Sequence, residues 1–312
     1  MHWRPMIDLI VLGAAAGGGF PQWNSNAEGC RRARAGDPAA PPRSQASIAI
    51  SGDGHNWFVV NASPDLRAQI TATPALHPRE GLRSTPLQGV ILTGGEVDTI
   101  AGLLTLRERE PFTVFADPRV LAMLDANPIF EALNREIVAR VAMPHDTGFP
   151  LPLKDGRLSG LIVTSFSVPG KVPLYAESVA DPAALIDNGE TVGLDITDGS
   201  RRIVFIPGCA ALNDAVRARV EGADAVLFDG TLWRDDEMIA AGLGPKTGRR
   251  MGHLSVSGED GVMALLAPHA IGRRIFIHIN NSNPILLADS AERAAVGEAG
   301  WEVAFDGMRV TL

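Results

Sequence analysis

The feature that most constrains this 312-residue chain is a series of short apolar runs, rich in β-branched residues and separated by Gly, Pro and Asp. Such runs predict strands bounded by turns. An N-terminal group and a C-terminal group can be distinguished: 7–12, 46–50, 57–61, 89–92 and 113–115, then 161–167, 192–196, 203–207, 225–228, 275–279, 302–305 and 308–311. Apolar residues at helical spacing predict helices in much of the remaining sequence, at 99–109, 118–133, 213–221, 258–266 and 288–298.

Two groups of strands interspersed with helices predict an α/β (α+β) fold, an αββα sandwich of two mixed β-sheets flanked by helices. We expect a single domain over 1–312, because no internal repeat and no low-complexity linker divides the chain. Turn residues predict hairpins at 197–200 and at 306–307. We also expect the two termini to contribute to different sheets.

Charge and hydropathy exclude several classes of function. The net charge is −8 and no basic cluster offsets it, which argues against a nucleic-acid-binding surface. No apolar run approaches the roughly 18 residues that a membrane span needs. The apolar stretch at 7–20 is interrupted by Asp8 and by glycines, so it is interpreted as a strand and a loop rather than a signal peptide. Two cysteines, Cys30 and Cys209, are too few for a disulfide framework, and we expect a cytoplasmic protein.

A glycine-rich loop at 13–19 follows the first predicted strand. It has neither the G-x-G-x-x-G spacing nor the Gly-Lys-Ser/Thr ending of nucleotide-binding loops. The Phe20-Pro21 that follows is a poor helix start. We therefore predict a loop that allows close backbone approach, and not a phosphate-binding site.

Two acidic residues follow the strand predicted at 89–92, within the decapeptide TGGEVDTIAG at 93–102. Glu96 and Asp98 are two positions apart, so on an extended loop both carboxylates would point to one side and could reach one metal ion. The alternative is a helix start, with Thr93 or Asp98 as the N-cap and acids favoured by the helix dipole. Taken alone, the helix start is the better interpretation.

Two further strand ends carry groups able to bind metal or move protons. His278 ends an apolar strand and precedes the polar loop NNSNP at 280–284, which favours a site over a core histidine. Asp229 follows the strand at 225–228, where a simple turn is the alternative. His253 precedes a helical pattern. Three separate segments that deliver acids or histidines at strand ends favour one shared site.

Several motifs together resemble one family: FPQWN at 20–24, NASPD at 61–65, PGKVP at 169–173, MGH at 251–253 and HINNSNP at 278–284. They are similar to those of the pyrroloquinoline quinone (PQQ) biosynthesis protein B family, in the metallo-β-lactamase superfamily, and they span nearly the whole chain. The resemblance implies a role in making the redox cofactor PQQ. It favours iron- and oxygen-dependent hydroxylation of the tyrosine ring in a cross-linked Glu–Tyr precursor. The alternative is a non-catalytic carrier of PQQ or its precursor.

The superfamily would show T-H-x-H-x-D-H-x-x-G at 93–102. Thr93, Asp98 and Gly102 are retained, whereas Gly94, Glu96 and Thr99 replace the histidines, so a zinc hydrolase is the least favoured function. The resemblance implies a metal held by Asp98, His278 and His253. Two imidazoles and a carboxylate suit Fe(II), with another divalent metal as the alternative.

The resemblance also implies supporting roles for other residues. His253, Glu96 and Asp229 are the candidate catalytic residues, and Glu96 or Asp229 could replace a ligand or support one. Cys209 lies near the position of a bridging aspartate, where a small buried residue is favoured over a soft ligand. The candidate substrate-binding residues are Asn280, Asn281, Asn283 and Lys171.

Relatives commonly carry C-x-C-x-x-C after Trp-Asn, which looks like part of a structural zinc site. Ser25, Ala27 and Cys30 stand at those positions, so a tightly held structural zinc is not expected. The expected partners are a small-molecule PQQ precursor, other PQQ-biosynthesis proteins and a second copy of the chain in a homodimer. Neither nucleic acid nor a membrane is expected.

Overall fold

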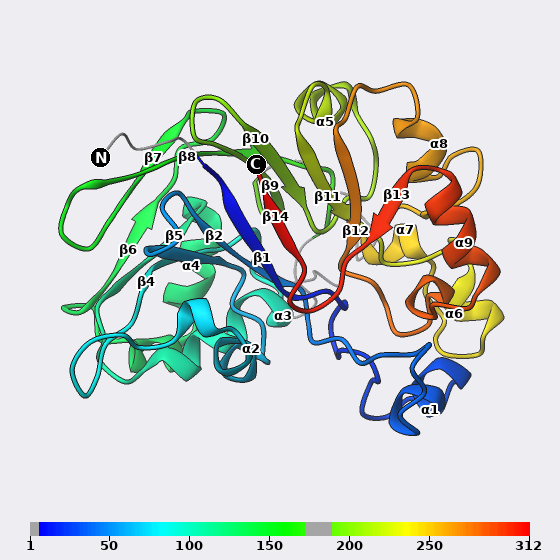
Figure 1. The fold of residues 1–312 in the computed structure, drawn as a ribbon, viewed down its shortest axis with the longest axis horizontal. Helices are drawn as coiled ribbons and strands as arrows, with labels where there is room; N and C mark the ends of the chain where they lie inside the picture. Colours follow the sequence, from blue (N-terminus) through cyan, green and yellow to red (C-terminus); the bar gives the residue numbers. More distant parts are fainter. Residues whose placement is uncertain (1–5, 172–188) are drawn as a thin grey trace.

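The structure, a computed structural model, describes residues 6–171 and 189–312. Within these ranges the strands form two seven-stranded sheets (Figure 1). The first sheet has the order β14 (Arg309–Thr311), β1 (Asp8–Gly13), β2 (Ser47–Ser51), β3 (Trp57–Val60), β4 (Leu87–Ile91), β5 (Phe112–Ala116) and β6 (Val138–Ala142). The second has the order β13 (Trp301–Val303), β12 (Arg273–Ile277), β11 (Ala225–Asp229), β10 (Arg202–Ile206), β9 (Val192–Thr197), β8 (Leu158–Ser167) and β7 (Phe149–Pro152).

Both sheets are mixed, as predicted. The first is antiparallel from β14 to β3 and parallel from β3 to β6. The second is antiparallel from β7 to β10 and parallel from β10 to β13. The predicted hairpin at 197–200 joins β9 to β10, and Gly199 takes the positive φ of 93° that this turn requires.

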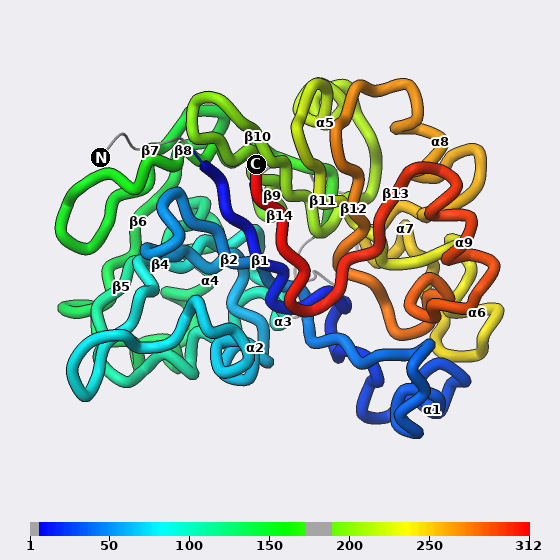
Figure 2. Tube along the Cα trace, viewed as in Figure 1, coloured from blue at the N-terminus to red at the C-terminus, as the bar shows by residue number. Residues whose placement is uncertain are grey.

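The prediction that the termini belong to different sheets is wrong. β1 and β14 are neighbours in one sheet, with Leu9 opposite Val310 (Figure 2). The predicted hairpin at 306–307 is also wrong, because β13 and β14 belong to different sheets. A turn is present, with Gly307 at φ 89°, but it carries the chain from one sheet to the other. Alternation of apolar residues predicts a strand without indicating which sheet it joins.

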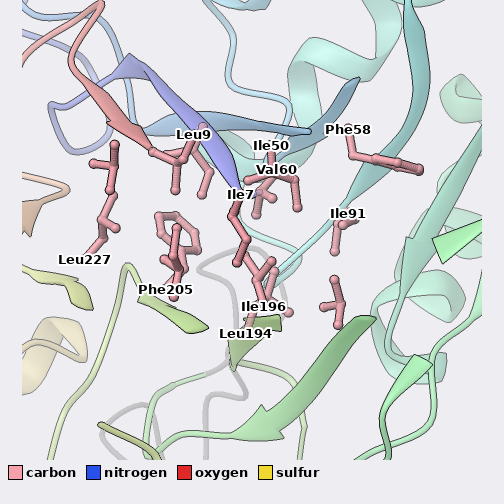
Figure 3. Close-up of a cluster of buried hydrophobic side chains, with 14 of the residues drawn as sticks. Ile7, Leu9, Ile50, Phe58, Val60, Ile91, Leu194, Ile196, Phe205 and Leu227 are labelled. Atoms are coloured by element: carbon pink, nitrogen blue, oxygen red, sulfur yellow. The ribbon is translucent and has the colours of Figure 1, made fainter. Parts of the chain in front are cut away.

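A hydrophobic core lies between the two sheets, and side chains from both sheets point toward one another there (Figure 3). The labelled members are Ile7, Leu9, Ile50, Phe58, Val60, Ile91, Leu194, Ile196, Phe205 and Leu227, all fully buried. Both sheets therefore contribute to one core.

Helices cover the outer face of each sheet. A second cluster packs the first sheet against α2 (Leu66–Ala72), α4 (Pro118–Ala126) and the 3₁₀ helices η2 (Ala101–Leu106) and η3 (Pro128–Ala132). A third packs the second sheet against α5 (Asp214–Val220), α8 (Val262–Leu266) and α9 (Ala291–Glu298). The four layers therefore form the predicted αββα sandwich. Shorter elements are η1 (Pro74–Leu76), α3 (Val97–Ile100), α6 (Glu237–Ala240), α7 (Gly248–Met251) and η5 (Pro284–Leu286).

Several predicted helices are shorter than expected. The pattern at 118–133 is split into α4 and η3, because Asn127 precedes Pro128 and takes an extended conformation at φ −113° and ψ 98°. The pattern at 99–109 is α3 followed by η2, and that at 258–266 becomes helical only from Val262. β6 and β7 were not predicted. β7 holds two prolines, which an edge strand tolerates and a central strand does not.

The segment around α1 (Glu28–Arg34) extends away from the first sheet and lies beside the region before α9 (Figure 2). Arg32 bridges Asp37 and Asp289, both at 2.6 Å, and the amide of Ala288 donates to the carbonyl of Ala39 at 2.7 Å. In the described ranges, no helix is long and apolar enough to cross a membrane.

Candidate metal centre and cavity

A cavity of about 420 Å³ opens at the carboxyl ends of several strands from both sheets. Loops that follow β1, β3, β4, β8, β10, β11 and β12 contribute to its walls. The lining residues that can bind metal, carry charge or move protons are Glu96, Asp98, Lys171, Glu190, Lys246, His253 and His278. The cavity therefore lies where the sandwich brings strand ends together.

The loop after β4 is held in place by side chains that contact its backbone. The Asn61 amide donates to the Thr93 hydroxyl and accepts from the Thr93 N–H, both at 2.9 Å. The Thr99 hydroxyl donates to the carbonyls of Gly94 (3.0 Å) and Glu96 (2.8 Å). Thr99, which stands where the superfamily has a metal-binding histidine, thus closes the loop instead.

The loop is a helix start, but its N-cap is Glu96 and not Thr93 or Asp98 as predicted. α3 begins directly after Glu96. The Glu96 side chain nevertheless makes no capping bond, and Glu96 and Asp98 both line the cavity. The helix start therefore places Glu96 and Asp98 on the wall of the same cavity.

The glycine loop allows the close backbone approach that was predicted. A Cβ at Gly13 would overlap the carbonyl oxygen of Gln45. A Cβ at Gly17 would lie 3.4 Å from Oδ2 of Asp98, so this loop packs directly over the carboxylate. Larger side chains at Gly17 would crowd Asp98.

His278 and Asp98 form an ion pair from opposite sheets, with Nε2 of His278 3.1 Å from Oδ2 of Asp98. Burial opposes the charged form of His278, but the hydrogen bond and charge of Asp98 outweigh it, so the pKa of His278 is raised. Burial also opposes ionisation of Asp98, and the hydrogen bond from His278 outweighs it, so the pKa of Asp98 is lowered. His278 has φ 58°, a conformation that costs a non-glycine residue roughly 1–3 kcal/mol and is common at functional sites.

Asp229 is fully buried, and its carboxylate is saturated with donors. Oδ1 accepts from the N–H (3.1 Å) and hydroxyl (2.6 Å) of Thr231. Oδ2 accepts from the N–H of Cys209 at 3.0 Å and lies 2.7 Å from Nδ1 of His253. Since its lone pairs are used, Asp229 is suited to orienting His253 rather than to binding a metal directly.

The two histidine rings stack, with centroids 5.2 Å apart and planes 24° apart. In the part of the chain that is described, Asp229, His253 and His278 are the group whose ligand atoms all lie within 4.8 Å of one another. Asp98, the carboxylate predicted as a ligand, is not in this group, and it contacts Nε2 of His278 at 3.1 Å. His278, Asp98 and His253 all line the cavity.

This donor set fits a divalent cation. Imidazole and carboxylate together suit Fe²⁺, Mn²⁺ or Zn²⁺. Nε2 of His278 and Oδ2 of Asp98 lie 3.1 Å apart, and these two side chains would hold the ion. Behind them, bonds to Asp229 and Thr231 orient the rings, as the partners of metal-binding histidines do.

The predicted substrate-binding residues fall into two groups. Lys171 and Asn280 line the cavity. Asn281 and Asn283 lie outside its lining and brace the loop: Asn283, only 1% exposed, bonds to the carbonyl of Gly230 and the amide of Ile285. Asn281 donates to the Gln22 side chain. Of the PGKVP motif, residues 172 and 173 lie outside the described ranges.

Both cysteines are buried free thiols. The Cys209 thiol donates to the carbonyl of Ala211 at 3.2 Å and belongs to the outer core of the second sheet, which agrees with a small buried residue. The Cys30 thiol lies 3.5 Å from Oδ1 of Asn281.

Sequence reasoning missed Lys246 and Thr231. Lys246 lies in a loop before α7 with no periodic signal, and only the tertiary structure places it on the cavity wall. Thr231 lies two residues after the end of β11. Its neighbours in space, His253 and His278, are distant in sequence.

Comparison with known proteins assigns the class first. Residues 56–279 match the family model of the β-lactamase superfamily domain, so fold and site define a protein of the metallo-β-lactamase fold. The chain is 69% identical to coenzyme PQQ synthesis protein B of Gluconacetobacter diazotrophicus, covering 98% of this chain and 100% of that one. It is 57% identical to the same protein of Gluconobacter oxydans, covering 98% and 99%. The chain therefore belongs to the coenzyme PQQ synthesis protein B family, which confirms the resemblance seen in its motifs.

Solved structures agree. The structure of Zn²⁺-bound PqqB from Methylobacterium extorquens matches with a TM-score of 0.92 and 49% identity, covering 98% of this chain and 100% of that one. A diphosphatase from the PhnP family matches with a TM-score of 0.68 at 17% identity, over 98% and 97% of the two chains, and shows the fold alone.

Proposed function

We propose that this protein acts in PQQ biosynthesis as an iron- and oxygen-dependent hydroxylase of the tyrosine ring in a cross-linked Glu–Tyr precursor. The observation that carries the proposal is the donor set at the cavity, in which Asp98 and His278 meet at 3.1 Å and His253 stacks beside them. Two imidazoles and one carboxylate with open positions are the ligand set of many iron oxygenases. At 93–102 the histidines of the hydrolytic site are replaced.

Bound Fe(II) would supply the activation of oxygen. Asp98 and His278 would anchor the ion, on a loop and a strand end that are both fixed by hydrogen bonds. His253 donates Nδ1–H to Asp229, which leaves its Nε2 to bind the ion or to move a proton at the ring hydroxyl. Glu96, also on the cavity wall, is placed to support the ligands.

The cavity suits a small amino-acid precursor. Its volume of about 420 Å³ lies within the range of small-molecule sites. Lys171 and Lys246 bring positive charge to its wall, where carboxylates of the precursor would bind. We further propose that the protein works in the cytoplasm, where its two buried cysteines would stay reduced. We also propose that it acts together with other proteins of the pathway.

Lys246→Gln is expected to raise KM for the precursor by about 10-fold or more, because a charge-assisted hydrogen bond is worth about 1.5–3 kcal/mol and 1.4 kcal/mol is a factor of ten. The effect on kcat should be smaller. Initial-rate kinetics measure both. Lys154→Gln is the matched control: Lys154 bonds the carbonyl of Thr85 and does not line the cavity. Equal KM values in both variants and the wild type would remove Lys246 from the substrate site.

The function is tested with protein reconstituted with Fe(II), the cross-linked Glu–Tyr precursor and oxygen. Oxygen consumption and a product heavier by one oxygen atom, absent under anaerobic conditions and with the zinc-loaded protein, are expected. Tight binding of precursor or PQQ without turnover with any metal would instead establish the carrier function. Metal-dependent hydrolysis without oxygen consumption would establish a hydrolase.

A further inference from the structure

Thr231 occupies the centre of the polar cluster behind the cavity. It follows β11 by two residues and is only 4% exposed. Its hydroxyl lies 2.6 Å from Oδ1 of Asp229, 2.9 Å from Nδ1 of His278 and 3.1 Å from Nδ1 of His253. It also lies 3.0 Å from the carbonyl oxygen of His278. One hydroxyl therefore contacts both histidines and the buried carboxylate.

The hydrogen-bonding capacity of a hydroxyl decides where the protons are. Thr231 has one proton to donate and two lone pairs to accept with. The ionised carboxylate of Asp229 only accepts, and its contact is the shortest and charge-assisted, so the hydroxyl proton points to Asp229. The hydroxyl oxygen must then accept from Nδ1–H of His278.

The position of the proton on His253 follows from the same argument. Its Nδ1 is closer to Oδ2 of Asp229, at 2.7 Å, than to Thr231, so Nδ1–H of His253 donates to the carboxylate. Both rings thus carry a proton on Nδ1, and the second proton that His278 holds on Nε2 in the ion pair with Asp98 is the one that a metal ion would displace. In each, Nε2 is the nitrogen left to take part at the cavity, and for His278 it faces Asp98 at 3.1 Å.

We propose that Thr231 is a positioning residue that holds His278 in the Nδ1–H form and fixes its ring so that Nε2 faces Asp98 as a metal ligand. The inference rests on the metal site of the proposed function. A ligating histidine normally donates its other N–H to a fixed partner. Here that partner is a hydroxyl whose own proton is tied to a buried carboxylate, so His278 and His253 are oriented by one connected unit.

The test compares Thr231→Val, which keeps the shape but removes the hydroxyl, with Thr231→Ser, which keeps the hydroxyl. Fe(II) and Zn(II) affinities are measured by competition with a chelating indicator. Thr231→Val is expected to bind about 10–100-fold more weakly, the usual cost of removing such a partner. Thr231→Ser should stay close to the wild type. Thr197→Val, which removes a hydroxyl in the β9–β10 turn, is the control for loss of a threonine hydroxyl.

A second measurement uses the wild-type protein and does not depend on any variant folding. Nitrogen-15 NMR of histidine in the zinc-loaded wild type should show the His278 proton on Nδ1 and the metal on Nε2. Metal on Nδ1, or Thr231→Val binding as tightly as the wild type, would overturn the role of Thr231. A wild type that binds no divalent metal would instead overturn the metal site itself.

Discussion

His278→Ala is expected to abolish oxygen-dependent turnover and to weaken metal binding far beyond the about 10–100-fold that loss of a ligand's partner costs. The reason is that His278 supplies the imidazole nitrogen facing the cavity and pairs with Asp98 at 3.1 Å. Removing it leaves the partly buried carboxylate of Asp98 without its charged partner. Metal affinity by competition, together with oxygen consumption and product formation on iron-reconstituted protein, measures the effect.

Graded variants separate ligands from supporting residues. Asp98→Ala should lose as much metal affinity and oxygen-dependent turnover as His278→Ala. Glu96→Gln should lower activity by only about 10–100-fold if Glu96 supports the ligands. His55→Ala is the control, since His55 is exposed and contacts Arg79 on the surface. Full activity and metal binding in both His278→Ala and Asp98→Ala would show that the site is misplaced.

Gly102→Ala is expected to destabilise the protein by about 3 kcal/mol or more, at or above the upper end of the usual cost of overpacking. A Cβ there would overlap the carbonyl oxygen of Ser63 and lie 2.8 Å from that of Ala62. Both obstacles are backbone atoms, and the Gly102 amide already donates to Ala62 at 2.8 Å, so the segment cannot simply move away. Denaturant unfolding measures the change in the free energy of unfolding.

Gly297→Ala provides the matched comparison. Gly297 lies in α9, where a Cβ would meet nothing within 4 Å. Alanine should therefore stabilise the helix, by up to about 1 kcal/mol. If Gly102→Ala unfolded at the same denaturant concentration as the wild type, the close packing of η2 against the end of β3 would be wrong.

The sequence predicted the region of the candidate site because several of its residues lie at or beyond the ends of predicted strands. Asp229 ends β11, His278 directly follows β12, and Asp98 lies in α3 beyond the end of β4 in the other sheet. The role of each residue, as a ligand or as a residue that orients a ligand, could not be predicted from the sequence. Asp229 became an orienting residue only because the N–H of Cys209 and both donors of Thr231 reach its oxygens, and those donors come from different loops.

The sequence by itself determined most strands and helices, the αββα layering and the family, because hydrophobic periodicity and contiguous motifs are local properties of a chain. It did not determine which sheet a strand joins. β14 pairs with β1 across nearly the full length of the chain, and β13 does not pair with β14 although a turn connects them. Pairing partners, the cavity wall at Lys246 and the contact of Thr231 with two histidines are set by packing between distant segments, which alternation within one segment cannot encode.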